Sequence, residues 1–277
     1  MHRLIVPMES SPQEGPSPEG APSVVSRILA VPKKGASRDE YEDAAAVRDE
    51  TWPVRAAVAD GATESVFARS WAETLADGLS TVAATPEALA QALPEWQASW
   101  TDALAARADS LPWYTAAKAR KGAFAAVLGI ECRRDGRWRA VSVGDALLLH
   151  LRGTALQRTW PHTAPDDFTS RPALVPSRPD RPAPFPEDYR SVTGTWQRGD
   201  AFLLATDAVA AWLLRVGFQD GPSPSGAGPA AARSWSPEAF REVVAAGRAE
   251  GHLRNDDSTL LVLEVGNSAA SGEPSSP

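Results

Sequence analysis

The chain has 277 residues, 43% of them hydrophobic and 23% charged, so it is long enough to bury a large core. Its formal net charge of −7 argues against nucleic acid as a partner, because a phosphate backbone favours a basic surface. A single cysteine, Cys132, excludes an internal disulfide framework and favours a reducing compartment. No apolar run approaches the roughly 18 residues that span a bilayer, so we expect a cytoplasmic protein with no membrane partner.

The composition along the chain predicts one domain between two disordered ends. Residues 1–23 are rich in Pro, Gly, Ser and Glu and are expected to form a disordered leader, and residues 267–277 a disordered tail. The domain then spans residues 24–266. Eight prolines between Pro161 and Pro186 exclude a central strand or a long helix there, which predicts a proline-rich flap at residues 160–187.

The hydrophobic pattern predicts strands and helices in groups rather than in strict alternation. Strands are expected at 24–31, 44–47 and 54–59, followed by helices at 65–79 and 86–107, the second broken at Pro94. Two strands, 123–134 and 137–144, flank Asp135-Gly136, a dipeptide that favours a hairpin turn, and 146–152 follows as a strand. Beyond the flap we expect a strand at 200–207, helices at 208–216 and 236–248, and a last strand at 258–265. Hairpins indicate mostly antiparallel sheets, hence an α+β fold.

Acidic residues recur where the predicted strands begin or end. They are Glu42-Asp43, Asp60 before Gly61, Asp145, Asp207 and Asp256-Asp257. Carboxylates gathered in one place repel one another and persist mainly when a divalent cation neutralises them. Oxygen ligands without nearby Cys or His select Mg²⁺ or Mn²⁺. The pattern alone leaves open that these acids are ordinary turn and cap residues.

The order of these motifs resembles the type-2C, metal-dependent protein phosphatase (PPM) family, as a divergent, bacterial-like member. The motifs are RDEYED, VADGAT, VGDALLLH, LLATDAVAAW and NDDST, and the resemblance runs from Val24 to Val265. It implies a four-layer sandwich of two mostly antiparallel sheets flanked by helices. It also implies hydrolysis of phosphoserine and phosphothreonine in proteins, by a hydroxide that bridges two Mn²⁺ or Mg²⁺ ions.

The resemblance also implies roles for individual residues. Asp60 would bridge the two metals, and the carbonyl of Gly61 would bind one of them. Glu42 would act partly through water, and Asp207 and Asp256 would complete the ligands. The remaining implied roles are phosphate binding by the guanidinium of Arg38, a supporting role for Asp43, and a structural turn at Asp145.

Three departures from the family pattern keep rival functions open. Ala62-Thr63 stands where the family commonly has His or Met and then Gly, and apolar Ala119 and Ala211 stand where acids would hold a third metal. We therefore predict two metals. The first rival is a non-catalytic phosphatase-like module that binds phosphoproteins or a partner kinase. The second is a hydrolase of small phosphoesters on the same scaffold.

Overall fold

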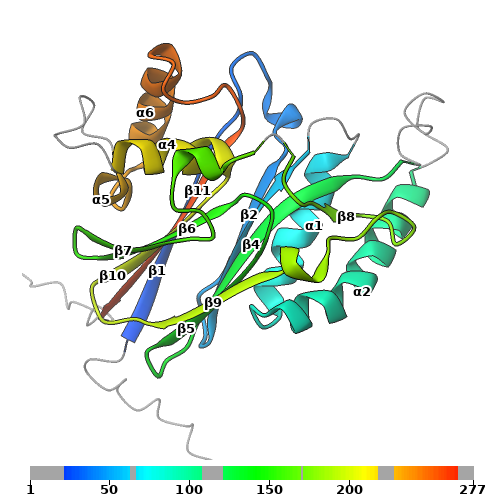
Figure 1. The fold of residues 1–277 in the computed structure, drawn as a ribbon, viewed down its shortest axis with the longest axis horizontal. Coiled ribbons are helices and arrows are strands. Elements are labelled where there is room, and N and C mark those ends of the chain that lie inside the picture. The colour runs from blue at the N-terminus through cyan, green and yellow to red at the C-terminus, as the bar shows by residue number, and fades with distance from the viewer. Residues whose placement is uncertain (1–21, 63–66, 108–120, 170, 218–227, 268–277) are drawn as a thin grey trace, which may run out of the picture.

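The structure is a computed structural model that describes residues 22–62, 67–107, 121–169, 171–217 and 228–267. Two antiparallel sheets face one another at its centre (Figure 1). Sheet A has the strand order β1 (Pro22–Val31), β11 (Ser258–Asn267), β10 (Asp200–Ala205), β6 (Leu147–Arg152), β7 (Ala155–Trp160). Sheet B has the order β2 (Asp43–Arg48), β3 (Val54–Gly61), β4 (Phe124–Cys132), β5 (Arg137–Val143), β9 (Arg190–Thr195), and the short β8 (Val175–Pro176) pairs with β4.

Helices cover the outer face of each sheet, as Figure 1 shows. Sheet A carries α4 (Asp207–Gly217), α5 (Pro229–Ala232) and α6 (Pro237–Ala249), and sheet B carries α1 (Ala68–Thr81) and α2 (Pro86–Ala105). Buried apolar side chains form three layers, one between the sheets and one between each sheet and its helices. The predicted α+β fold of two antiparallel sheets flanked by helices is confirmed.

The alternation of side chains along β3 determines which residues face which layer. Val54, Ala56 and Val58 lie in the layer between the two sheets, whereas Ala57 and Ala59 pack under the helices of sheet B. Successive residues of a strand point to opposite faces, so the odd positions of this strand face α1. Helix α1 contributes Trp71, Leu75 and Leu79 to that layer, and each is at most 1% exposed. Burying a side chain of this kind contributes about 1.5–3 kcal/mol.

Helix α2 corrects one prediction about the chain. It runs unbroken through Pro94, where the sequence pattern predicted a break. Thr85 caps its start, because its hydroxyl accepts a hydrogen bond from the amide of Ala88 at 3.2 Å. Leu89, Leu93 and Trp100 bury the helix against its neighbours, and this packing offsets the one hydrogen bond that the proline removes.

Several further elements differ from the sequence expectation in detail. Strands β7 and β9 were not predicted as separate strands. The predicted leader and tail lie largely outside the described residues, although β1 already begins at Pro22 and β11 extends to Asn267. The proline-rich segment contains β8, whose Val175 is fully buried against Ala125 of β4. Within the described part of the chain, no helix combines the length and apolar character needed to cross a bilayer.

Asp200, the first residue of β10, is the centre of a buried hydrogen-bond network. Asp200 is 0% exposed and accepts hydrogen bonds from Arg152 Nε at 2.9 Å and the Gln197 amide at 2.9 Å, and it pairs with His150 Nε2 at 2.9 Å. His150 in turn stacks on Phe202, with ring centroids 4.6 Å apart. Burial raises the pKa of Asp200, but the hydrogen bonds from Arg152, Gln197 and His150 outweigh it, and the pKa ends below its usual range.

We expect Asp200→Asn to lower the free energy of unfolding at pH 7 by about 3 kcal/mol, because Arg152 and His150 lose a buried anionic partner. The folded-state pKa of Asp200 is depressed, so its contribution is present above the unfolded pKa and is lost as the pH falls through the folded pKa. Urea unfolding from pH 7 down to pH 3 should therefore show the difference shrinking. The exposed Asp135→Asn variant is the control, and an Asp200→Asn difference no larger than its own would contradict this account.

Candidate metal centre

The carboxylates of Asp43 and Asp60 lie side by side at one end of sheet B. The two residues are register partners in the antiparallel pair β2–β3, and directly opposed residues share a face of the sheet. Asp60 has the same parity along β3 as Ala56 and Val58, so its side chain lies on the face toward sheet A. Asp43 is buried and Asp60 is partly buried.

Asp43 joins sheet B to sheet A. Its Oδ2 accepts hydrogen bonds from Thr206 Oγ1 at 2.8 Å and from Thr259 Oγ1 at 2.7 Å. Thr206 follows β10 directly, and Thr259 lies at the start of β11, so both threonines come from sheet A. Burial raises the pKa of Asp43 to about 8, although the hydrogen bonds from Thr259 and Thr206 lower it. Asp43 therefore links the two sheets beside Asp60, and the supporting role that the resemblance implied for it stays a prediction.

Asp257 is a site residue to which sequence reasoning gave no role. It is 4% exposed and accepts the backbone amides of Lys33 at 2.8 Å and Glu42 at 2.7 Å. The neighbouring Asn255 Oδ1 accepts the amide of Lys34 at 2.6 Å. These contacts hold the segment before β2 against the turn before β11, and so they place Glu42 beside the other carboxylates. The sequence indicated only that two acids, Asp256 and Asp257, stand together before β11. Their spacing does not show which of the two accepts hydrogen bonds from backbone amides.

Gly61 is required by the space around it. A Cβ built there would lie 2.7 Å from the carbonyl oxygen of Glu42 and 2.9 Å from the backbone of Ala68. Those atoms belong to backbone and cannot move aside cheaply. The end of β3, the residue before β2 and the first turn of α1 therefore approach one another closely at this point.

Asp145 occupies the turn between β5 and β6. Gly144 before it has a φ of 102°, in the left-handed region that favours glycine, and a Cβ there would lie 2.5 Å from that of Ala126. Asp145 is 5% exposed. Burial raises its pKa to about 7, and the negative charge of Asp207 acts in the same direction.

Electrostatic effects connect five of the acidic residues at this end of the sandwich. Burial raises the pKa of Asp60 well above its usual range, and four other carboxylates raise it further: Asp43, Asp207, Asp145 and Asp256. The pKa of Asp207 is raised as well, first by burial. Like charges that raise one another's pKa favour any cation that can lie among them. The donors are all hard oxygens, and in this respect they fit Mg²⁺ or Mn²⁺.

Basic side chains form ion pairs with two of these carboxylates, Glu42 and Asp207. Lys33 Nζ lies 3.1 Å from Glu42 Oε2, and Arg254 donates a hydrogen bond to Asp207. Across the described residues, no three Asp, Glu, His or Cys side chains converge tightly enough to hold a metal ion. The donor chemistry thus fits a divalent ion, and Asp207 and Glu42 would have to leave their basic partners to ligate one.

Other predicted positions are only partly described. Arg38 begins a 3₁₀ turn, Arg38–Glu40, and its side chain lies outside the described part. Thr63 and Ala119 also lie outside it. Ala62 is partly buried, and its amide donates to the carbonyl of Phe124 at 2.9 Å. Ala211 lies on α4, four residues after Asp207.

Solved structures of phosphatases share this fold. The serine/threonine phosphatase PstP/Ppp of Mycobacterium tuberculosis matches with a TM-score of 0.56 and 13% identity, over 88% of this chain and 99% of that one. The photosystem II phosphatase PBCP matches with a TM-score of 0.52 and 15% identity, over 87% and 98%. The catalytic domain of PstP in complex with two manganese ions matches with a TM-score of 0.50 and 16% identity, over 88% and 100%.

The chain has the fold of the PPM phosphatases. The likeness covers nearly all of each matched structure, and at these identities it is a likeness of fold. No protein-family profile matches the sequence, and no curated protein matches it. The fold that the motif order implied is therefore confirmed by structure rather than by overall sequence similarity.

We expect Arg254→Gln to tighten Mn²⁺ binding about fivefold, because the ion no longer has to displace a guanidinium from Asp207. Isothermal titration calorimetry of the metal-free protein with MnCl2 measures this directly. Arg241→Gln removes an exposed charge on α6 and serves as the control. Equal or weaker binding by Arg254→Gln would show that the arginine does not compete with the ion.

Proposed function

We propose that the protein is a Mn²⁺- or Mg²⁺-dependent phosphatase that acts on phosphoserine and phosphothreonine in proteins. The observation that carries the proposal is a group of five aspartates at one end of a PPM-type sandwich. The negative charges of four of them, Asp43, Asp145, Asp207 and Asp256, raise the pKa of the fifth, Asp60. We propose that it works in the cytoplasm, because a chain with a single cysteine has no internal disulfide framework and suits a reducing compartment.

The chain's own residues suggest how such a reaction would be organised. Two divalent ions, when bound, would supply a water of low pKa and would neutralise charge on the phosphoryl group. Asp60, Glu42, Asp207 and Asp256 would hold these ions, with the carbonyl of Gly61. Asp43 and Asp257 would not ligate but would keep β2, β3 and the preceding segment in place through their hydrogen bonds.

A cleft beside Glu42 offers room for the phosphorylated residue. It has a volume of about 620 Å³ and lies between the segment before β2 and the first turn of α1. Lys33, Arg69 and Arg107 contribute positive charge to its wall, and Phe67 contributes an apolar surface. Four acidic residues, among them Glu42 and Glu73, line it as well, and Arg69 pairs with Glu73 at 2.9 Å. Lys33 already lies against Glu42, so it could hold a phosphate oxygen next to the carboxylates. Arg38 is expected to assist from the same segment.

A non-catalytic module that binds phosphoproteins or a partner kinase is the second candidate. Two observations support this non-catalytic module. Lys33 and Arg254 neutralise two of the expected ligands, Glu42 and Asp207, and Ala62 replaces the family's turn residue. Such a module would keep the cleft and lose turnover. A hydrolase of small phosphoesters is the third candidate.

We expect Asp60→Asn to reduce Mn²⁺-dependent hydrolysis of a phosphothreonine peptide by at least about 100-fold, because the amide removes the charge at the centre of the carboxylates. Turnover of the peptide and of p-nitrophenyl phosphate is measured with and without MnCl2. Asp77→Asn, an exposed acid on α1, is the matched control. Melting temperatures confirm that each variant is folded.

The outcomes separate the three candidates. Turnover in the wild type that vanishes in Asp60→Asn supports the phosphatase. Wild-type protein that is folded, binds the phosphopeptide and turns over neither substrate would overturn the enzyme in favour of the binding module. Turnover of the small ester alone would favour the third candidate.

A further inference from the structure

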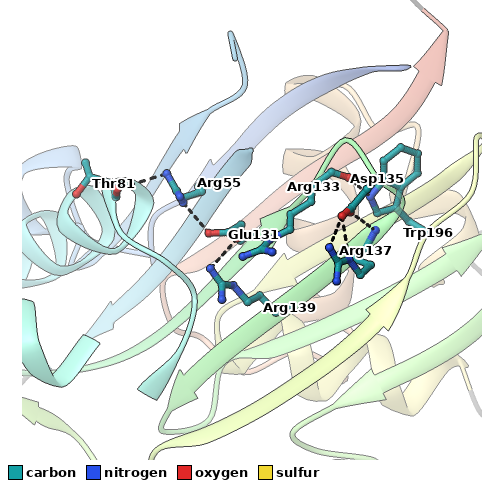
Figure 2. Close-up of polar contacts among 8 residues, drawn as sticks. All are labelled: Arg55, Thr81, Glu131, Arg133, Asp135, Arg137, Arg139 and Trp196. Carbon is teal, nitrogen blue, oxygen red and sulfur yellow. Dashed lines mark hydrogen bonds and ion pairs between the residues drawn. The ribbon is translucent and has the colours of Figure 1, made fainter. Parts of the chain in front are cut away.

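A second cleft opens at the end of sheet B opposite to the acidic residues. It has a volume of about 430 Å³, and its walls include Trp52, Arg55, Glu131, Arg133, Arg134 and Arg139. Arg55, Glu131 and Arg139 are neighbours in register on β3, β4 and β5, so their side chains share the face that α1 covers. They lie just beyond the last turn of that helix, where Arg55 Nη1 donates to the carbonyl of Thr81 at 3.4 Å (Figure 2).

Three arginines in this cleft converge on one carboxylate, as Figure 2 shows. Glu131 has a side chain only 1% exposed, and it lies 2.9 Å from Arg55 Nε, 2.9 Å from Arg133 Nε and 2.8 Å from Arg139 Nη2. Burial raises the pKa of Glu131, but the hydrogen bonds from the three arginines outweigh it and the carboxyl stays ionised. One negative charge therefore faces three positive ones.

The arginines carry more donors than the protein uses. A guanidinium has five N–H donors, and Glu131 has two oxygens to share among three of these groups. Arg139 Nε is buried and has no hydrogen-bond partner within the described residues. Arg134, next to Arg133, is exposed. The other acid here, Asp135, pairs with Arg137 at 2.5 Å, so it does not balance the excess.

Pairing with Glu131 does not account for all of these arginines. Arg55 bonds Glu131 and also contacts the end of α1, whereas Arg134 is not among the partners of Glu131. Arg133 and Arg134 lie in the turn of the β4–β5 hairpin, where the side chain of Arg133 stays 42% exposed and Arg134 is exposed as well. Beside them, Trp52 stacks on Trp196 with centroids 5.6 Å apart and gives the cleft an apolar edge.

We propose that this cleft binds the phosphate group of a phosphorylated peptide segment, with Arg133, Arg134 and Arg139 as its ligands. The planar guanidinium fork matches two phosphate oxygens at once, which suits a phosphate monoester better than a single carboxylate. The residues flanking the phosphorylated side chain would lie along Trp52 and Pro53. The site therefore takes a segment of a protein partner.

The site is separate from the candidate metal centre. Arg55 and Asp60 lie five residues apart on β3, which corresponds to about 17 Å along an extended strand. A phosphate held in the basic cleft is out of reach of the acidic residues, so it would be docked rather than hydrolysed. The inference does not depend on turnover at the other end of the domain.

Binding of a fluorescent phosphoserine peptide to the full chain, in EDTA, tests the proposal by fluorescence polarisation. EDTA removes divalent ions, so phosphate binding through metals does not contribute. We expect the phosphopeptide to bind at least about tenfold more tightly than the same peptide with serine, and binding to weaken as salt rises. Inorganic phosphate and AMP serve as competitors, and both are expected to be weaker than the peptide.

Variants locate the binding in this cleft. Arg133→Ala/Arg134→Ala should weaken phosphopeptide binding at least about tenfold, and Arg134→Ala alone about threefold. The single variant keeps every contact of Glu131, so it remains informative if the double variant is unstable. Arg241→Ala, which removes an exposed charge on α6, should change binding less than about twofold by the same reasoning.

Three results would overturn the proposal. The first is equal affinity for the phosphorylated and unphosphorylated peptides, or no binding of either. The second is an equal loss of affinity in Arg134→Ala and Arg241→Ala. The third is competition by inorganic phosphate or AMP as strong as that of the peptide, which would make the cleft a site for small anions.

Discussion

The hydrogen bonds that Asp43 accepts from Thr206 and Thr259 fix how the two sheets meet at the acidic end of the sandwich. Thr259 belongs to sheet A and Thr206 directly follows strand β10 of that sheet, whereas Asp43 belongs to sheet B. Because Asp43 and Asp60 are opposed in the β2–β3 ladder, fixing one fixes the other. Asp257 then holds Glu42 through its backbone amide. Buried hydrogen bonds of two other acids, Asp43 and Asp257, thus help to position the candidate ligands Asp60 and Glu42.

The same gathering of acids creates an electrostatic problem that the molecule answers with basic side chains. Arg254 neutralises Asp207, and Lys33 neutralises Glu42. A divalent ion would remove the same repulsion more effectively, since it carries two charges on one small centre. Metal binding would therefore compete with these two ion pairs in stabilising the cluster. At the opposite end of sheet B the charges are reversed, with three arginines around the buried Glu131.

The strand pattern predicted most of the strands, because period-2 alternation is a local property of the chain, but it missed β7, β8 and β9. It also placed Asp60 at the end of β3, where the structure puts it. The local pattern could not predict which residues distant in sequence form ion pairs. Arg254 and Asp207 are 47 positions apart, and nothing in either local motif indicates that they meet. The break expected at Pro94 was wrong, because packing of the surrounding helix outweighs one lost hydrogen bond. Sequence therefore identified the acids and missed their basic partners.

The acidic end of the sandwich is proposed to hold divalent ions. Anomalous diffraction from crystals of the full chain grown with saturating MnCl2 tests it most directly. Manganese peaks are expected beside the carboxylate of Asp60 and the carbonyl of Gly61, with Arg254 turned away from Asp207. An intact Arg254–Asp207 pair, with no manganese peak near Asp60, would contradict the proposal.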